Sequence, residues 1–305
     1  MKLPSKPHPK KPGDEIRPQF AWIPIIIAVG YLIYTFTVHD DVVKWLKEHF
    51  GDKVAKTYDL AVFALGFVIP SGEIRWEAEI VKDGSRLTKL IIKAKNTAGE
   101  VLKTVSFSKG AIDNLAKAGL LQETAENKQI WINLVKYSEK FRLSTDKTAR
   151  IISKISEKGV KKGYIRAMLR RGTNPKALEK LANEYLPYWR GTVSGVHQIV
   201  DVFEAKGITT KVGGHKIQNF AVLKQGNYKF GGIHIFQKHA TDFDKVFYTQ
   251  TGDDIINLIR KTLENPDEVK YLPNEVQVTK KFGLYFENGK AYVREVVVSI
   301  NKMGV

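Results

Sequence analysis

The stretch Phe230-Gly-Gly-Ile-His234-Ile-Phe-Gln-Lys-His239-Ala-Thr-Asp-Phe243 decides how the C-terminal part of this chain is organised. It carries two of the seven histidines, five residues apart, after a Gly-Gly break and among apolar side chains. Histidine is the side chain best suited to proton transfer near neutral pH. The stretch therefore predicts a helix that carries one or two catalytic histidines.

A helix and a short sheet are predicted to follow this stretch. The helix covers about residues 253–263 and ends at Asn265-Pro266-Asp267, because proline cannot continue a helix. The strands cover residues 275–282, 284–287 and 291–300, and the last two meet at Asn288-Gly289 in a tight hairpin. A helix backed by such a sheet could cleave a phosphodiester without a metal ion.

Three segments of this region resemble the small ribonuclease toxins grouped with barnase, EndoU, colicin D and RelE. They are "GGIHIFQKH", a helix ending in "TLENPDEV" and the hairpin "GLYFENGKAYVREVVVSI". Phage-associated and polymorphic-toxin members have a similar histidine helix and a closing valine-rich strand. The resemblance covers about residues 227–305. It implies a ribonuclease toxin domain, RNA as the substrate and a cognate immunity protein as a further partner.

Acid–base cleavage of RNA needs a group that takes the 2′-OH proton, a group that protonates the leaving 5′-oxygen, and cations near the phosphorus. Candidates for each role occur in the C-terminal region. His239 and His234 would move protons, Lys281 and Arg294 would stabilise charge, Tyr292 or Ser299 would hold the phosphate, and Lys280 and Lys238 would contact the substrate.

The pleat of the last strand limits which of these side chains share one cleft. Tyr292 and Arg294 share one face of the strand, while Ser299 lies on the other unless a bulge intervenes. We prefer Arg294 with Tyr292 and hold Ser299 as the substitute. Among the histidines we expect His239 to matter more, because apolar neighbours surround His234 and packing would explain that residue.

Two other interpretations of the histidines compete with proton transfer. A spacing of five on an α-helix places His234 and His239 about 140° apart, whereas zinc pairs on one helical turn need a spacing of four. With no cysteine in the chain and no third ligand in view, we expect no metal and no cofactor. The plainer alternative is an ordinary packing sheet with a buried structural histidine.

The chain is strongly basic, and the charge is uneven. The net charge of +17 favours an anionic partner such as nucleic acid or a membrane surface. Residues 226–305 hold 11 Lys/Arg and 10 Asp/Glu, so nearly all of the excess lies upstream of the proposed catalytic region. Residues 150–171 alone hold eight Lys/Arg against one Glu, which predicts a basic helix face.

The N-terminus predicts contact with a membrane. Residues 1–19 form a proline-rich basic leader, and residues 20–38 form an uncharged run. As a helix this run spans roughly 28 Å, close to the thickness of a bilayer core. Trp22, Tyr31 and Tyr34 would serve as its interfacial residues. A cleaved signal peptide and a buried core helix are the alternatives.

Residues 39–207 are predicted to be a mostly helical, basic delivery or pre-toxin region. Apolar residues recur at three and four over residues 86–105, which predicts a helix, and alternate over 73–81, which predicts strands. Capping residues at Ser108, Ser144 and Asn174 mark further helix starts, and a helical pattern over 193–203 includes His197. With residues 208–305 as the toxin domain, the fold class is α+β.

Two functions are compatible with this pattern. The first is a membrane-associated or secreted toxin whose C-terminal domain is a metal-independent endoribonuclease that acts in the target cytoplasm. The second is a non-enzymatic, membrane-anchored binding or structural protein whose basic helices meet an anionic partner.

Overall fold

The computed structural model describes residues 69–71, 74–83, 86–122 and 124–301. The basic leader, the run at 20–38 and its residues Trp22, Tyr31 and Tyr34 lie outside the described residues. Within the described part of the chain, no helix is long and apolar enough to cross a membrane. The described residues contain both helices and antiparallel sheets, so the predicted α+β class is confirmed.

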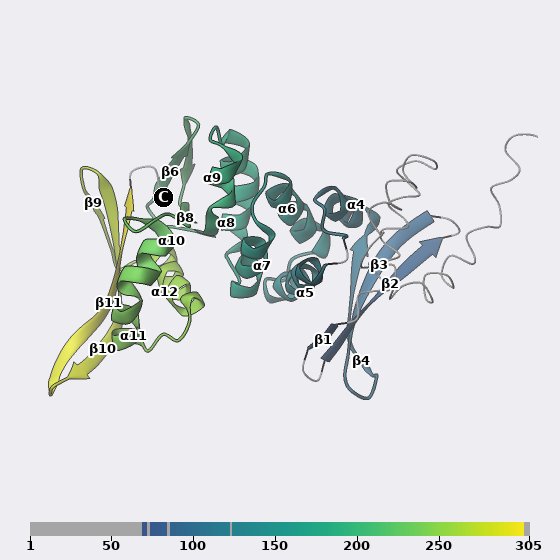
Figure 1. Ribbon diagram of the computed structural model, residues 1–305, viewed down its shortest axis with the longest axis horizontal. Coiled ribbons are helices and arrows are strands. Elements are labelled where there is room, and N and C mark those ends of the chain that lie inside the picture. Colours follow the sequence, from purple (N-terminus) through teal and green to yellow (C-terminus); the bar gives the residue numbers. More distant parts are fainter. Residues whose placement is uncertain (1–68, 72–73, 84–85, 123, 302–305) are drawn as a thin grey trace, which may run out of the picture. The chain divides into compact units, whose positions relative to one another are not determined.

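The described part begins with a four-stranded antiparallel sheet (Figure 1). Its strands follow in chain order: β1 Ile69–Ser71, β2 Ile74–Asp83, β3 Arg86–Lys95 and β4 Val101–Ser108. The predicted strand over 73–81 is confirmed, but the predicted helix over 86–105 is wrong. Leu90, Ile92 and Ala94 are buried at every second position, so the two-residue period prevails, and Gly99, with φ of +83°, lies in the turn.

Helices follow the sheet in sequence. They are α4 Lys109–Lys117, α5 Ala125–Lys140, α6 Thr145–Glu157, α7 Lys162–Arg171, α8 Pro175–Lys180, the π-helical η1 Leu181–Tyr185, the 3₁₀-helical η2 Leu186–Tyr188 and α9 Val193–His197. The predicted caps are confirmed, since Ser108, Ser144 and Asn174 each accept a hydrogen bond from the first turn. Trp131 is fully buried, and its ring centroid lies 4.8 Å from that of Phe107, so helix α5 packs against the sheet.

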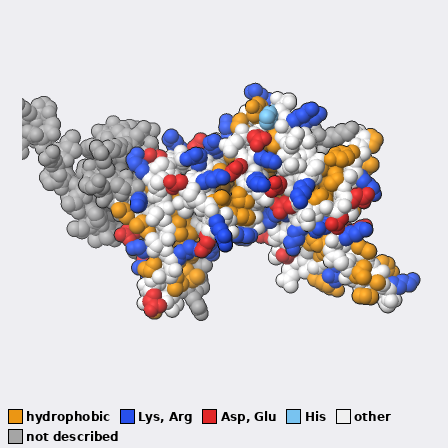
Figure 2. Space-filling view, turned by 180° about the vertical axis from the view of Figure 1, so that it is seen from behind, with side chains coloured by type: hydrophobic (Ala, Val, Ile, Leu, Met, Phe, Trp, Pro, Cys, Tyr) orange, Lys and Arg blue, Asp and Glu red, His pale blue; other side chains and the backbone are white. Residues whose placement is uncertain are grey.

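The predicted basic face over residues 150–171 does not lie on one helix. Helix α6 ends at Glu157 and α7 begins at Lys162, with Gly159 at φ of +93° between them. Lys162 turns inward, donates to the carbonyl oxygen of Gly119 at 3.0 Å and has its pKa lowered by burial. Figure 2 shows Lys and Arg side chains spread over the visible face with Asp and Glu among them.

Two small antiparallel pairs come next. Strand β5 Ile199–Phe203 pairs with β8 Ala221–Lys224, and β6 Thr209–Val212 pairs with β7 His215–Gln218. The predicted helix over 193–203 is therefore wrong beyond His197, because every residue of β5 is buried and a run apolar on both faces suits a strand. Gly213 and Gly214, both at positive φ, form the turn between β6 and β7.

The chain closes with helices and a three-stranded sheet. The helical elements are α10 Gly231–His234, the π-helical η3 Ile235–His239, α11 Ala240–Phe247 and α12 Gly252–Glu264. The strands are β9 Glu268–Tyr271, β10 Glu275–Glu287 and β11 Lys290–Asn301, in the order β11-β10-β9. The predicted hairpin at Asn288-Gly289 is confirmed, since both residues have positive φ, of 51° and 74°. Strand β9 was not predicted.

One hydrophobic core joins these closing elements to the β5–β8 pair. It packs side chains of β5 and β8 against helix α12 and strands β10 and β11; its residues are Val200, Phe203, Ala205, Ile208, Ala221, Leu223, Ile255, Ile256, Ile259, Leu263, Val278 and Ile300. Residues on both sides of position 207, where the sequence suggested a boundary, therefore share this core.

A buried ionic network, which we call the Asp201 network, ties the helices to the same core. Asp201 is fully buried in β5 and accepts from Arg171 Nε at 2.8 Å, Arg260 at 3.0 Å and Thr173 Oγ1 at 2.7 Å. Arg171 belongs to α7 and Arg260 to α12. The network therefore holds α7, β5 and α12 in one fixed arrangement.

Candidate active site

A π-helical turn brings His234 and His239 onto the same face. Helix α10 passes through η3 into α11, and η3 ends at His239 while His234 is its N-terminal cap. A π-turn closes its hydrogen bond from i to i+5 and so holds more residues than the 3.6 of an α-helix turn. Residues five apart then lie one above the other. The predicted separation of about 140° is wrong because it assumed a regular α-helix.

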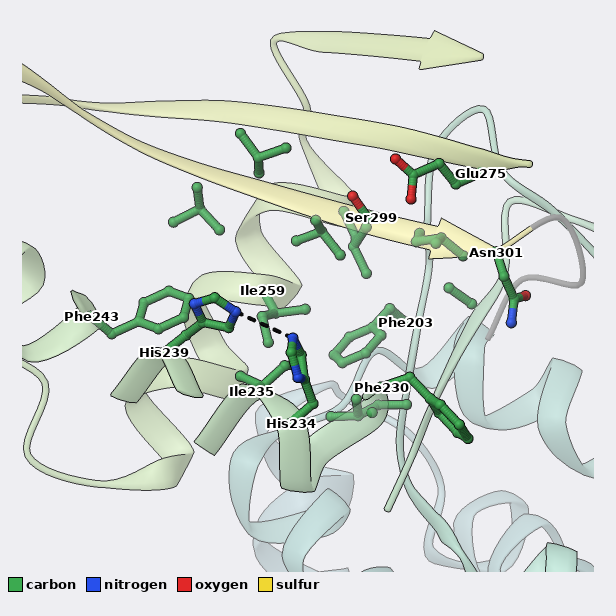
Figure 3. Close-up of a pocket in the computed structure, with 18 of the residues that line it drawn as sticks. Phe203, Phe230, His234, Ile235, His239, Phe243, Ile259, Glu275, Ser299 and Asn301 are labelled. Atoms are coloured by element: carbon green, nitrogen blue, oxygen red, sulfur yellow. Dashed lines mark hydrogen bonds between the residues drawn. The ribbon is translucent and has the colours of Figure 1, made fainter. Parts of the chain in front are cut away.

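The two imidazole rings face each other across the turn. Their Nε2 atoms lie 3.3 Å apart, their ring centroids 5.0 Å apart, and the rings stand at 74° to one another. Figure 3 shows both rings turned toward each other from the helix side of a cavity. The His239 side chain is 48% exposed, whereas His234 is half-buried. His239 is therefore the more open of the two, as the sequence predicted.

The second nitrogen of each ring is held by a fixed partner. His234 Nδ1 lies 2.7 Å from the carbonyl oxygen of Tyr228, and His239 Nδ1 lies 3.2 Å from Asp242 Oδ2. A carbonyl oxygen and a carboxylate only accept, so each Nδ1 carries a hydrogen and donates it. In the neutral ring the lone pair is then on Nε2. The two lone pairs consequently face one another.

A glycine-bounded loop supplies the Tyr228 carbonyl. The Asn227 amide donates to the Phe230 carbonyl at 2.9 Å, and the Lys229 amide donates to the Asn227 side chain at 2.8 Å. Gly231 has φ of +78°, and a Cβ there would lie 2.7 Å from the Lys224 carbonyl oxygen. The loop therefore requires glycine at this position, where it leads into helix α10.

The histidine pair opens into a cavity of about 660 Å³ between the α10–η3–α11 helices and strand β11 (Figure 3). Among the described residues β11 pairs with β10 alone, so the cavity runs along its other edge. The floor is apolar and includes Phe203, Ile235, Phe243 and Ile259. The polar and charged side chains that line the cavity are Lys229, His234, His239, Asp242, Asn274, Glu275, Glu295, Ser299 and Asn301.

Only some of the predicted catalytic residues line the cavity. His234, His239 and Ser299 line it, whereas Arg294, Tyr292 and Lys281 do not. The cavity thus places Ser299, and not the preferred Arg294 and Tyr292, beside the histidines, while the catalytic roles of all three stay predictions. The Arg294 guanidinium lies over the Tyr248 ring at 5.5 Å, and Tyr292 stacks on Tyr285 at 5.4 Å, so both side chains are engaged elsewhere.

The remaining lysine candidates also lie outside the cavity lining. Lys280 donates to the carbonyl oxygen of Asn265 at 2.8 Å and pairs with Asp267, so it stabilises the connection after α12. The Lys281 and Lys238 side chains are exposed. These three lysines were predicted to contact charge or substrate, and the geometry brings none of them into the lining.

The lysine and the carboxylates of the cavity were not predicted from the sequence. Lys229 is the one Lys or Arg among the described lining residues, and Asp242, Glu275 and Glu295 are its acidic members. A signal for Lys229 was its place in the Asn-Tyr-Lys-Phe turn just before Gly231. Asp242 follows His239 by three residues, a spacing that brings side chains together on a helix.

The comparisons leave the family open. Comparison with protein-family models, with curated proteins and with solved structures found no match for this chain. The resemblance to ribonuclease toxins therefore stays a prediction. Within the described residues, no group of three or more His, Asp or Glu side chains is placed to hold a metal ion.

Proposed function

We propose that the C-terminal part of this chain is a ribonuclease that uses the His234–His239 pair for acid–base catalysis. The observation that carries the proposal is the pair itself: two imidazoles that line one cavity, each with a fixed Nδ1 partner, and whose Nε2 atoms face each other. Two such groups fit a reaction that both removes and returns a proton. The resemblance of residues 227–305 to ribonuclease toxins supports the same reaction.

The chemistry is a transesterification within the RNA. The neutral imidazole takes the proton of the 2′-OH as its oxygen attacks phosphorus, and the protonated imidazole gives its proton to the 5′-oxygen as the P–O5′ bond breaks. The products are a 2′,3′-cyclic phosphate and a 5′-OH. The pair ends with the same number of protons as it began with, and no metal ion is required.

The spacing of the pair restricts how the phosphate enters. A group held between two nitrogens by hydrogen bonds of ordinary length needs them roughly 5–6 Å apart. Because the Nε2 atoms lie 3.3 Å apart, the rings must turn away from each other as the phosphate binds. Lys229 is the lining cation that would stabilise the phosphorane, and Ser299, on the strand side, would hold a phosphate oxygen.

His239 is the residue we assign to the base. Its ring is nearly half exposed, and the Asp242 carboxylate beside its Nδ1 would stabilise the imidazolium that forms when Nε2 takes a proton. His234, held by the Tyr228 carbonyl, is assigned to the acid. Asp242 is a positioning residue in this scheme, since it acts through His239.

The substrate test follows from the role of the 2′-OH. The full chain, incubated with an RNA oligonucleotide in excess EDTA, should cut it and leave a 2′,3′-cyclic phosphate. The same sequence with 2′-O-methyl groups, or as DNA, should stay intact. Cutting of the modified strand at the rate of the RNA would overturn this mechanism. A folded chain that cuts no RNA would instead favour the non-enzymatic binding protein.

A further inference from the structure

We propose that the same two histidines form a binding site for a transition-metal ion of the zinc class, and that this ion inhibits the proposed ribonuclease. The metal site rests on geometry alone; the inhibition rests on the proposed function. The occupant is a divalent ion that favours imidazole, such as Zn²⁺, Ni²⁺ or Cu²⁺, and not Mg²⁺ or Ca²⁺, which favour oxygen ligands.

The distance between the two nitrogens fits a shared metal ion. Zinc binds imidazole nitrogen at about 2.0–2.1 Å in tetrahedral geometry, so two such nitrogens lie about 3.3–3.4 Å apart. The observed Nε2–Nε2 separation is 3.3 Å. The same separation is within hydrogen-bonding range of a ring N–H and a ring nitrogen, so a metal ion at this point would replace a proton shared by the two rings.

The outer partners of the rings follow the pattern of metal-binding histidines. A ligating histidine usually donates its other ring N–H to a carboxylate or a backbone carbonyl, which fixes the tautomer and the ring direction. His239 has the Asp242 carboxylate in this position, and His234 has the Tyr228 carbonyl. When both rings are neutral, both Nε2 lone pairs are thereby directed to the same point, where a proton or a metal ion would bridge them.

The charge of the cavity also favours a cation. Asp242, Glu275 and Glu295 line it against Lys229 alone among the described basic side chains. With two histidine ligands, the remaining positions on the metal would be open to water or to another ligand. An ion bound there would occupy both lone pairs that the proposed cleavage needs, so metal binding and proton transfer exclude each other.

Binding of Zn²⁺ alone to the full chain, by isothermal titration calorimetry in a non-chelating buffer, tests the site without any RNA. We expect one site that is lost when His234→Gln and His239→Gln are combined. Asp242→Asn should weaken it by about 10- to 100-fold, as loss of an outer partner does. The matched control replaces His197 and His215, which lie outside the cavity lining, with glutamine. That control should bind as the wild type does, and Mg²⁺ should not compete.

Equal Zn²⁺ affinity in the wild type and in the His234/His239 double variant would overturn the site. It would also be overturned if the His197/His215 control lost as much Zn²⁺ affinity as that double variant. A second arm measures RNA cleavage with and without Zn²⁺. Zinc binding without any cleavage keeps the metal site and rejects the proposed ribonuclease. Cleavage without specific zinc binding keeps the proposed ribonuclease and rejects the metal site. Cleavage that zinc occupancy leaves unchanged rejects the inhibition.

Discussion

Replacing Asp201 with asparagine should cost about 3–5 kcal/mol of folding free energy, the usual cost of removing one partner of a buried ion pair. Asp201 is fully buried, and the side chains of Arg171 and Arg260 around it are only 5% and 9% exposed. Asparagine would turn a donor toward these two cations, remove the carboxylate that pairs with buried Arg260, and leave Arg171 paired with Asp253 alone. Since a domain is stable by roughly 5–15 kcal/mol, the loss is a large share of the total.

Urea unfolding followed by far-ultraviolet circular dichroism measures this loss. The matched control is Arg170→Gln, which breaks the pair with Asp253 at a side chain that is 61% exposed and should cost about 0–1 kcal/mol. Thr173→Val, which removes one hydrogen bond to Asp201, should fall between the two. If Asp201→Asn lies within about 1 kcal/mol of the wild type, the network does not hold α7, β5 and α12 together as described.

Three further changes test other parts of the structure. Gly231→Ala should destabilise the chain by about 1–3 kcal/mol in thermal unfolding and lower RNA cleavage, because its Cβ would press on the Lys224 carbonyl at positive φ; Gly214→Ala, with open space around it, should cost less. Burial raises the pKa of Glu264, so ionisation of this side chain lowers the stability of the fold at any pH above the ordinary carboxyl pKa. Glu264→Gln should therefore raise the melting temperature at pH 7. The gain should vanish as the pH falls below the ordinary carboxyl range, because Glu264 is then neutral in the folded and the unfolded chain. A fragment of residues 226–305 should show no cooperative unfolding, because it lacks the core side chains of β5 and β8, and a sharp melting transition in that fragment would refute the shared core.

The sequence predicted well where one local signal decides the structure. Asn288-Gly289 fixed the last hairpin, Ser144 and Asn174 fixed helix starts, and the Pro266 stop matched the end of α12. Each depends on the conformational preference of a few neighbouring residues. These elements needed no knowledge of distant contacts.

The sequence failed where distant packing decides. The segment 86–105 has apolar residues that satisfy both the helical and the strand period, and pairing with β2 selects the strand. The helical pattern over 193–203 predicts a helix where β5 lies, because the pairing of β5 with β8 depends on residues that are distant in the sequence. Local pattern alone therefore left the β5–β8 part of the core unseen.

In the candidate site, too, the features that depend on neighbouring residues were predicted and those that depend on tertiary contacts were not. Histidine as the reactive residue and the more open position of His239 were predicted from the neighbouring residues, but the π-turn that joins the two rings was not. Ser299 lines the cavity, whereas Arg294 does not and lies over the Tyr248 ring instead. Such choices depend on tertiary contacts that no spacing rule contains.

The rate of RNA cleavage by His239→Ala, compared with the wild-type full chain in excess EDTA, tests the central proposal most directly. Loss of one acid–base group should lower the rate by about 10²- to 10⁴-fold, while the melting temperature stays near that of the wild type. His215→Ala, at a ring stacked on Tyr188 outside the cavity lining, should cleave as the wild type does. If folded His239→Ala cleaves RNA at the wild-type rate, the histidine pair is not the catalytic group.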